Sequence, residues 1–186
     1  MSDLSVPEEL LTFFENSPVA LALGDPAGDN ELIMVNGRFS QLTGYGQMDL
    51  AKRNCRVLQG RGEDHEARAR LRAFLQDDAA VSVRTPILNF RKDGKPFVNL
   101  LYMSRLRTVS GRTRYIFASQ FDVSRTQPDR LRAYDAELSQ TLTRLSPIAA
   151  ESGIIVEGTL TTIANSASTI AQAKLTLASL DDSSIL

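Results

Sequence analysis

The chain has 186 residues, a formal net charge of −1 at pH 7 and 42% hydrophobic residues. It is long enough for one domain with an appendage, too polar for a membrane protein, and too weakly charged for a dedicated nucleic-acid binder, which usually carries a basic face. Its single cysteine excludes an internal disulfide and fits a reducing cytoplasm, and its single histidine argues against a multi-ligand zinc site, so we expect no metal.

The first elements are predicted to be a short amphipathic helix and two strands. Ser5-Val6-Pro7-Glu8 is typical of a helix start, with Glu8 placed to complete a capping box. The apolar stripe that follows predicts a helix over about 6–16. Strands are expected over about 19–23 and 31–35, joined by a segment with strong turn chemistry.

The middle of the chain is predicted to contain helices and then three antiparallel strands. Residues 37–60 contain short helical pieces broken by glycines, and residues 64–76 form the clearest helix, with Asp64 as its N-cap. Pro86 predicts an edge position or a bulge for the strand that contains it, and Gly94 favours a hairpin turn. The three strands are expected at about 80–91, 96–107 and 113–123. This order of elements describes an α+β fold.

Composition changes near Thr126-Gln127-Pro128, where the aromatic residues almost disappear. Apolar residues at helical spacing predict two further helices, over about 129–151 and 154–180, with a break near Ser146-Pro147 or Ser152-Gly153. The expected organisation is an N-terminal amphipathic helix (1–18), a core domain (19–125) and a C-terminal helical extension (126–186).

Three amide side chains are expected on apolar faces of the last three strands. The hairpin at Asp93-Gly94 places Asn89 and Asn99 on one face, because both have the same parity about the turn. Buried amides are costly without partners, so they either bond each other or water, or meet a heteroaromatic ligand. The spacing alone gives both interpretations equal weight, and Gln120 as a third amide favours a planar ligand with a polar edge. The apolar neighbours on these faces are Ile87, Leu101, Met103, Ile116 and Ala118.

Cys55 lies in the polar stretch Arg53-Asn54-Cys55-Arg56-Val57-Leu58-Gln59-Gly60. A lone cysteine is most often an inert core residue. Its hydrogen-bonding neighbours indicate that the thiol could face a polar ligand instead, while the alternative is a surface helix with one buried thiol.

Two arginines are candidates for phosphate recognition. The planar guanidinium groups of Arg56 and Arg72 suit a phosphate. Arg68 and Arg70 have a different helical phase, and a solvated basic face is the more common explanation for them.

With these residues the chain resembles the LOV subfamily of PAS domains. The family motif around the photoactive cysteine is Gly-x-Asn-Cys-Arg-Phe-Leu-Gln, and this chain has Lys52-Arg53-Asn54-Cys55-Arg56-Val57-Leu58-Gln59. The resemblance continues through Asn89-Phe90, Phe97-Val98-Asn99-Leu100 and Gln120, and covers about residues 19–123. It implies a PAS/LOV fold, a five-stranded antiparallel sheet with helices on one face, extended by terminal helices.

The resemblance also implies a blue-light photoreceptor that binds a flavin noncovalently in the dark, usually FMN, with riboflavin as an alternative. Light excites the flavin, and the Cys55 sulfur bonds reversibly to its C4a carbon, forming a photoadduct. Gln120 bonds O4 and relays the signal, and Arg56 and Arg72 match the positions that hold the phosphate. Asp49 and Lys92 match a frequent surface ion pair. The expected flavin-binding residues are Asn54, Arg56, Leu58, Gln59, Arg72, Ile87, Asn89, Asn99, Leu101, Ala118 and Gln120.

Four residues depart from the family pattern. Lys52 replaces a glycine, so a different local backbone geometry is expected, and Val57 replaces a phenylalanine and opens space beside the reactive helix. Leu101 and Ala118 stand where many relatives carry phenylalanine and glycine. These changes affect the expected lifetime of the photoadduct more than its chemistry.

We expect a sensory switch rather than an enzyme. A histidine-kinase fragment is disfavoured because no histidine follows residue 126, and a DNA-binding output is disfavoured because residues 127–186 carry four positive and seven negative side chains. The alternative is a PAS-type small-ligand binding or dimerisation module with an inert Cys55.

A homodimer through the terminal helices is expected, because their apolar positions exceed what one sheet face readily covers; a closed monomeric hairpin is the alternative. No nucleic acid or membrane partner is expected. In the N-terminal helix these positions are Leu10, Leu11 and Phe14. In the C-terminal extension they are Leu131, Tyr134, Leu138, Leu142, Leu145, Ile155, Leu160, Ile163, Ile170, Leu177 and Leu180.

Overall fold

The computed structural model describes residues 5–60, 64–127 and 146–183, and the side chains of 146–158 and 181–183 are outside the description. The predicted helix over 129–151 therefore lies mostly outside the described residues. Its apolar positions Leu131, Tyr134, Leu138, Leu142 and Leu145 are among those that the structure does not describe.

Five antiparallel strands form one sheet in the order β2-β1-β5-β4-β3. The expected five-stranded α+β fold is confirmed, and the bounds of each strand lie within two residues of the predicted ones. Pro86 lies in β3, an edge strand, where a missing N–H costs no ladder bond to a further strand. The strands are β1 (Ala20–Gly24), β2 (Leu32–Val35), β3 (Ser82–Phe90), β4 (Pro96–Arg107) and β5 (Thr113–Asp122).

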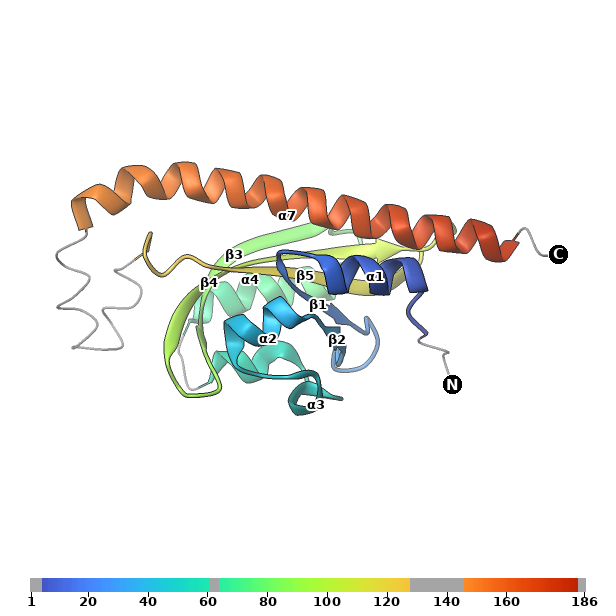
Figure 1. Ribbon diagram of the computed structural model, residues 1–186, viewed down its shortest axis with the longest axis horizontal. Coiled ribbons are helices and arrows are strands. Elements are labelled where there is room, and N and C mark those ends of the chain that lie inside the picture. Colours follow the sequence, from blue (N-terminus) through green and yellow to red (C-terminus); the bar gives the residue numbers. More distant parts are fainter. Residues whose placement is uncertain (1–4, 61–63, 128–145, 184–186) are drawn as a thin grey trace.

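Short helices cover one face of the sheet, which we call the inner face (Figure 1). Gly44 ends the first of them in a left-handed conformation, with φ 77°, so the predicted breaks at glycines are present. The longest begins after Asp64, whose Oδ1 accepts a hydrogen bond from Ala67 N, as the N-cap prediction requires. These helices are α2 (Gly37–Thr43), α3 (Gln47–Leu50), the 3-10 helix η1 (Cys55–Gln59) and α4 (His65–Gln76).

The terminal helices α1 (Glu8–Asn16) and α7 (Ser146–Ser183) lie across the opposite, outer face (Figure 1). The predicted capping box of α1 was wrong. Its N-cap is Pro7, which makes no side-chain cap, and the carbonyl of Ser5 accepts a hydrogen bond from the Tyr115 hydroxyl instead.

Helix α7 is longer than predicted. It continues through Ser152-Gly153, one of the two positions proposed for a break, so only the start at Ser146 agrees with a helix boundary. Among the described residues, no helix combines the length and the apolar character that crossing a bilayer requires.

Side chains alternate between the two faces of the sheet, and each face has its own core. In β1, Leu21 and Leu23 pack outward with Phe14 of α1, whereas Ala20 and Ala22 face inward. Both Phe14 and Leu10 are fully buried on the outer face. The expectation that they contribute to a dimer surface was therefore wrong, because the sheet and α7 cover them.

The buried side chain of Asn36 connects the terminal helix α1, the strand β1 and the inner helix α2. Its Oδ1 accepts from Leu21 N and Phe39 N, each at 3.0 Å. Its Nδ2 donates to Phe14 O at 3.0 Å and to Val19 O at 2.8 Å. Four hydrogen bonds from one amide fix the entry of α2 relative to α1 and β1.

Replacing Asn36 with alanine should destabilise the fold by about 2–4 kcal/mol, because buried backbone groups lose their partners. Urea unfolding measures this change. The matched control is Asn165→Ala, an exposed amide on α7, which should stay within about 0.5 kcal/mol of the parent. Equal stability of the parent and the Asn36 variant would contradict the role assigned to this side chain.

Candidate functional site

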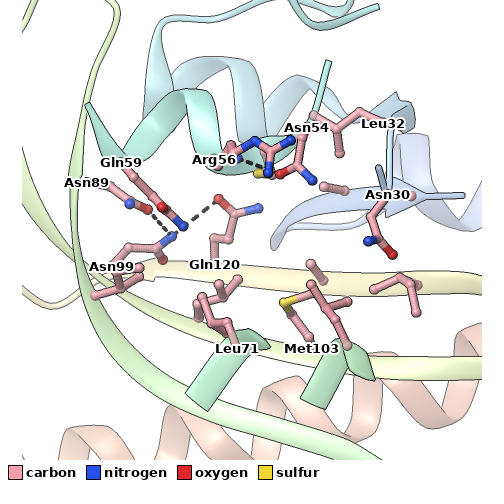
Figure 2. A pocket seen from close by; sticks show the side chains of 18 residues that line it. Asn30, Leu32, Asn54, Arg56, Gln59, Leu71, Asn89, Asn99, Met103 and Gln120 are labelled. Atoms are coloured by element: carbon pink, nitrogen blue, oxygen red, sulfur yellow. Dashed lines mark hydrogen bonds between the residues drawn. The ribbon is translucent and has the colours of Figure 1, made fainter. Parts of the chain in front are cut away.

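A cavity of about 110 Å³ lies between the inner face of the sheet and the helices η1 and α4 (Figure 2). Its wall is mostly apolar, with polar groups gathered at its two ends. The lining residues are Ala22, Gly24, Asn30, Leu32, Asn54, Cys55, Arg56, Gln59, Leu71, Leu75, Ile87, Asn89, Asn99, Leu101, Met103, Ile116, Ala118 and Gln120.

Three buried amides form one polar end of the cavity. Asn99 Nδ2 donates to Asn89 Oδ1 at 2.9 Å and to Gln120 Oε1 at 3.4 Å. The pairing of Ile87 with Asn99 and of Leu101 with Gln120 places all three amides on the inner face, as the hairpin register predicts.

These amides do not satisfy one another completely. Asn99 Oδ1 and Gln120 Nε2 are buried and have no hydrogen-bond partner among the described residues. A buried polar atom without a partner costs about 1–3 kcal/mol. Both residues line the cavity, so this end of the wall carries one acceptor and one donor whose hydrogen bonds are not made within the described residues.

The cysteine helix is fixed at both ends. Asn54 caps η1, because its Oδ1 accepts from Arg56 N at 2.9 Å, while its Nδ2 donates to the backbone oxygen of Asp29. At the other end Gly60 has φ 53°, and a Cβ there would lie 2.8 Å from the Phe90 ring. A side chain is excluded at this position, so glycine is required.

Cys55 lies in η1 and lines the cavity. Desolvation by burial raises the pKa of its thiol to about 12. The group is therefore a neutral, protonated thiol at pH 7, since the thiolate forms only near the raised pKa.

Lys52 has a backbone conformation that is uncommon for residues other than glycine. Its φ is 58°, in the left-handed region that glycine favours. An L-residue in this conformation carries strain of roughly 1–2 kcal/mol; the expected difference from relatives with glycine at this position stays a prediction.

The two arginines proposed for phosphate recognition differ in position. Arg56 lines the cavity and forms an exposed ion pair with Asp29. Arg72 lies on the exposed side of α4 and outside the cavity wall. Arg68, expected on a solvated face, is half-buried and donates to Gln59 O at 3.4 Å. It thereby connects α4 to the end of η1.

Helix α4 is held against the sheet by a buried arginine that the sequence analysis did not single out. Arg105 Nη2 donates to Phe74 O at 2.8 Å and to Asp77 O at 3.2 Å, at the C-terminus of α4. Its guanidinium also lies over the Phe74 ring, 4.9 Å from the ring centroid, which is within the range of a cation–π contact. This contact positions Leu71 and Leu75, which line the cavity.

Ten of the twelve residues predicted for the site line the cavity, and two do not. Leu58 is buried in the core behind the wall, and Arg72 points elsewhere. The apolar stripe of α4 and the parity of the strands signalled some of the missed lining residues, but not those from β1 and the loop before β2. The missed residues are Ala22, Gly24, Asn30, Leu32, Leu71, Leu75, Met103 and Ile116.

The predicted surface ion pair and the absence of a metal-binding group among the described residues concern the charged side chains. The surface ion pair is present, with Lys92 Nζ 2.8 Å from Asp49 Oδ1, and the hydrogen bond from Lys92 lowers the pKa of the Asp49 carboxyl. Within the ranges that the structure describes, no group of three or more His, Cys, Asp or Glu side chains is placed to hold a metal.

Comparisons with known protein families, sequences and structures agree on the family of this chain. The model of the PAS domain matches residues 18–125. Blue-light-activated histidine kinase 2 of Erythrobacter litoralis is 35% identical over 130 residues, which cover 69% of this chain and 37% of that protein. Blue-light-activated histidine kinase of Rhizobium johnstonii is 37% identical over 108 residues, 58% of this chain and 30% of that protein. The chain thus spans about a third of these two curated relatives.

Solved structures agree. The Rhodobacter sphaeroides LOV protein has a TM-score of 0.60 and 27% identity, covering 90% of this chain and 92% of that one. The LOV domain of an Erythrobacter litoralis blue-light-activated histidine kinase has a TM-score of 0.53 and 36% identity, covering 57% of this chain and 97% of that one.

Proposed function

Because the chain belongs to the PAS domain family, and within it to the LOV subfamily, we propose that it is a flavin-binding blue-light photoreceptor. The observation that carries this proposal is one cavity lined by both a neutral thiol and an incompletely bonded amide end. The thiol supplies a nucleophilic atom, and the amides supply recognition of a polar ring edge.

The proposed cofactor is FMN, with riboflavin as the alternative. The unpartnered Asn99 Oδ1 and Gln120 Nε2 fit a ring edge that presents both donors and acceptors, which the flavin ring has. The cavity volume of about 110 Å³ is smaller than the ~300–1,000 Å³ of common ligand pockets. Its wall includes the long, flexible side chains of Gln59, Leu71 and Met103, so we expect these to move outward when the ring enters.

When bound and illuminated, the flavin supplies an excited ring whose C4a carbon accepts a sulfur atom. Cys55 contributes both the sulfur and a proton, because its raised pKa keeps the S–H bond intact in the dark. Adduct formation would break the S–H bond, form an S–C bond and transfer the thiol proton to the ring, so Cys55 would supply both atoms and no external oxidant or reductant would be needed. Gln120 can then turn its amide from donor to acceptor, since an amide offers both.

Strands β4 and β5 connect the cavity to α7. Gln120 lines the cavity, while the preceding residue, Ser119, is buried on the outer face. In β4 the neighbours alternate in the same way, because Met103 lines the cavity and the Ser104 hydroxyl lies 2.5 Å from that of Ser168 in α7. We propose that movement of Gln120 reaches α7 through these two strands.

Helix α7 carries an exposed apolar stripe, which we propose to be a homodimer contact. Ile163, Ile170 and Leu177 repeat every seven residues, with Leu180 alongside, and are 39%, 45%, 54% and 50% exposed. A repeat of seven keeps one seam facing a partner helix. A second copy of the chain offers the same stripe, so the contact is self-complementary under two-fold symmetry.

Replacing Cys55 with alanine should leave flavin bound, because the amide end is intact, and should abolish the reversible bleaching of the blue absorption band under illumination. Absorption spectra before and after a light pulse measure both. The matched control is Met103→Leu, which removes the other sulfur of the cavity wall and should keep the bleach. A reversible bleach in the Cys55 variant would exclude the thiol as the reacting group, and a flavin-free parent would favour the small-ligand module.

Replacing Gln120 with leucine should preserve the bleach but remove most of the light-dependent change in hydrogen exchange of α7, because leucine cannot switch between donor and acceptor. Gln41→Leu, an exposed amide on α2, is the control and should retain the full change. If exchange in α7 responds to light equally in both variants, the signal takes another route.

Replacing Ile170 with glutamate should halve the particle mass from twice 20.4 kDa to 20.4 kDa, because an unpaired charge in an apolar contact is unfavourable by several kcal/mol. Light scattering in darkness and under blue light measures the mass. Thr169→Glu adds the same charge to the neighbouring exposed position and should leave the mass unchanged. A parent chain that is monomeric in both conditions would reject the dimer.

A further inference from the structure

Asp29, in the loop between β1 and β2, makes two contacts with the start of the cysteine helix. Its backbone oxygen accepts a hydrogen bond from Asn54 Nδ2, and its carboxylate accepts one from the Arg56 guanidinium. Figure 2 shows Asn54, Arg56 and Asn30 on the opposite side of the cavity from Asn89 and Asn99. The Asp29 ion pair therefore lies at the rim away from the amide end.

This ion pair involves the cation of the cavity wall that is best suited to a phosphate. Arg56 is the one arginine among the residues that line the cavity in the described structure. Its side chain is 60% exposed and that of Asp29 is 54% exposed, so a solute can reach both. A guanidinium binds an anion best through two parallel N–H donors. When a carboxylate already accepts from these donors, a second anion can only form hydrogen bonds of poorer geometry.

We propose that Asp29 is a specificity-determining residue that lowers the preference of the cavity for FMN over riboflavin. This inference rests on the proposed flavin-binding function. A ligand whose phosphate carries about −1.5 to −2 charge at pH 7 must displace Asp29 from Arg56, and it also meets the Asp29 charge at short range. Riboflavin has no phosphate and leaves the ion pair intact. The carboxylate therefore opposes the first ligand and not the second.

The test is a competition. The full chain is equilibrated in darkness with equimolar FMN and riboflavin and separated from free flavin, and the bound flavins are counted by chromatography. Asp29→Asn should raise the bound FMN-to-riboflavin ratio about two- to fivefold, the size expected of an exposed charge pair. Glu31→Gln is the matched control, since it removes one negative charge from the same loop at an exposed position, and should leave the ratio near that of the parent.

A second comparison tests the role of Arg56. Arg56→Gln should lower the ratio, and adding Asp29→Asn to it should raise the ratio less than Asp29→Asn does in the parent, because no guanidinium is left to compete for and only the charge repulsion is removed. Asp29→Ser should raise the ratio as Asp29→Asn does, and a ratio within one sample is insensitive to any loss of folded protein. An unchanged ratio in both Asp29 variants overturns the inference alone, whereas a parent chain that binds neither flavin overturns the proposed function.

Discussion

The pairing of β4 with β5 is the constraint on which the cavity and the outer core both depend. Leu101 lies opposite Gln120 and Tyr102 opposite Ser119, so one register assigns every side chain of both strands to a face. A slip of one residue would turn the amides toward α7 and bring the outer aromatic residues into the cavity. Helices cover both faces of the sheet, so a register shift would disturb the packing on both faces.

The register of β4 with β5 is irregular at one point. It shifts between Leu106 and Arg107, and the backbone of Arg107 then bonds a helix side chain. Gln172 of α7 accepts from Arg107 N at 2.7 Å and donates to Arg107 O at 2.8 Å. One amide thus replaces a strand partner where the ladder is irregular, and α7 is fixed along the same strand that lines the cavity.

The amides in the cavity wall make the fold less stable than apolar side chains would, and they offer hydrogen-bonding groups to a ligand. Close packing would fill it with apolar side chains, yet the strands place three amides there and leave two of their polar atoms without partners. A ligand that bonds these atoms binds the folded chain and not the unfolded one, so it stabilises the fold in proportion to its concentration and affinity. The buried Arg105 contributes from the other side by holding α4 in place without the ligand. The site is therefore organised before binding, though it remains incompletely bonded.

Local chemistry made much of the fold predictable, and long-range packing limited the rest. Asn89 and Asn99 could be placed together because a hairpin turn at Gly94 sets their register within a few residues. No local rule brings Asn30 of a distant loop to the rim, or pairs Asp29 with Arg56, because both depend on the pairing of β1 with β5, which is distant in sequence. The left-handed backbone at Lys52 could not be predicted from the residue type either, because a lysine disfavours that conformation.

Helix α7 inverts the usual arrangement of an amphipathic helix. Its buried face consists mainly of small residues, Ala164, Ala167, Ala171 and Ala178 with Leu175, whereas large apolar side chains point away from the sheet. Burying a large aliphatic side chain contributes about 1.5–3 kcal/mol, and an alanine contributes much less because it buries less area. Docking of α7 on the sheet therefore relies on polar contacts such as those of Gln172 and Ser168 more than on apolar burial.

These hydrogen bonds between α7 and the sheet are sensitive to small shifts of the strand beneath them, since a hydrogen bond weakens steeply when its distance or angle changes. A change of a few kcal/mol is enough to alter the population of a docked helix, and β4 and β5 carry the side chains of the cavity on their other face. We therefore propose that the position of α7 responds to events in the cavity without any contact between them.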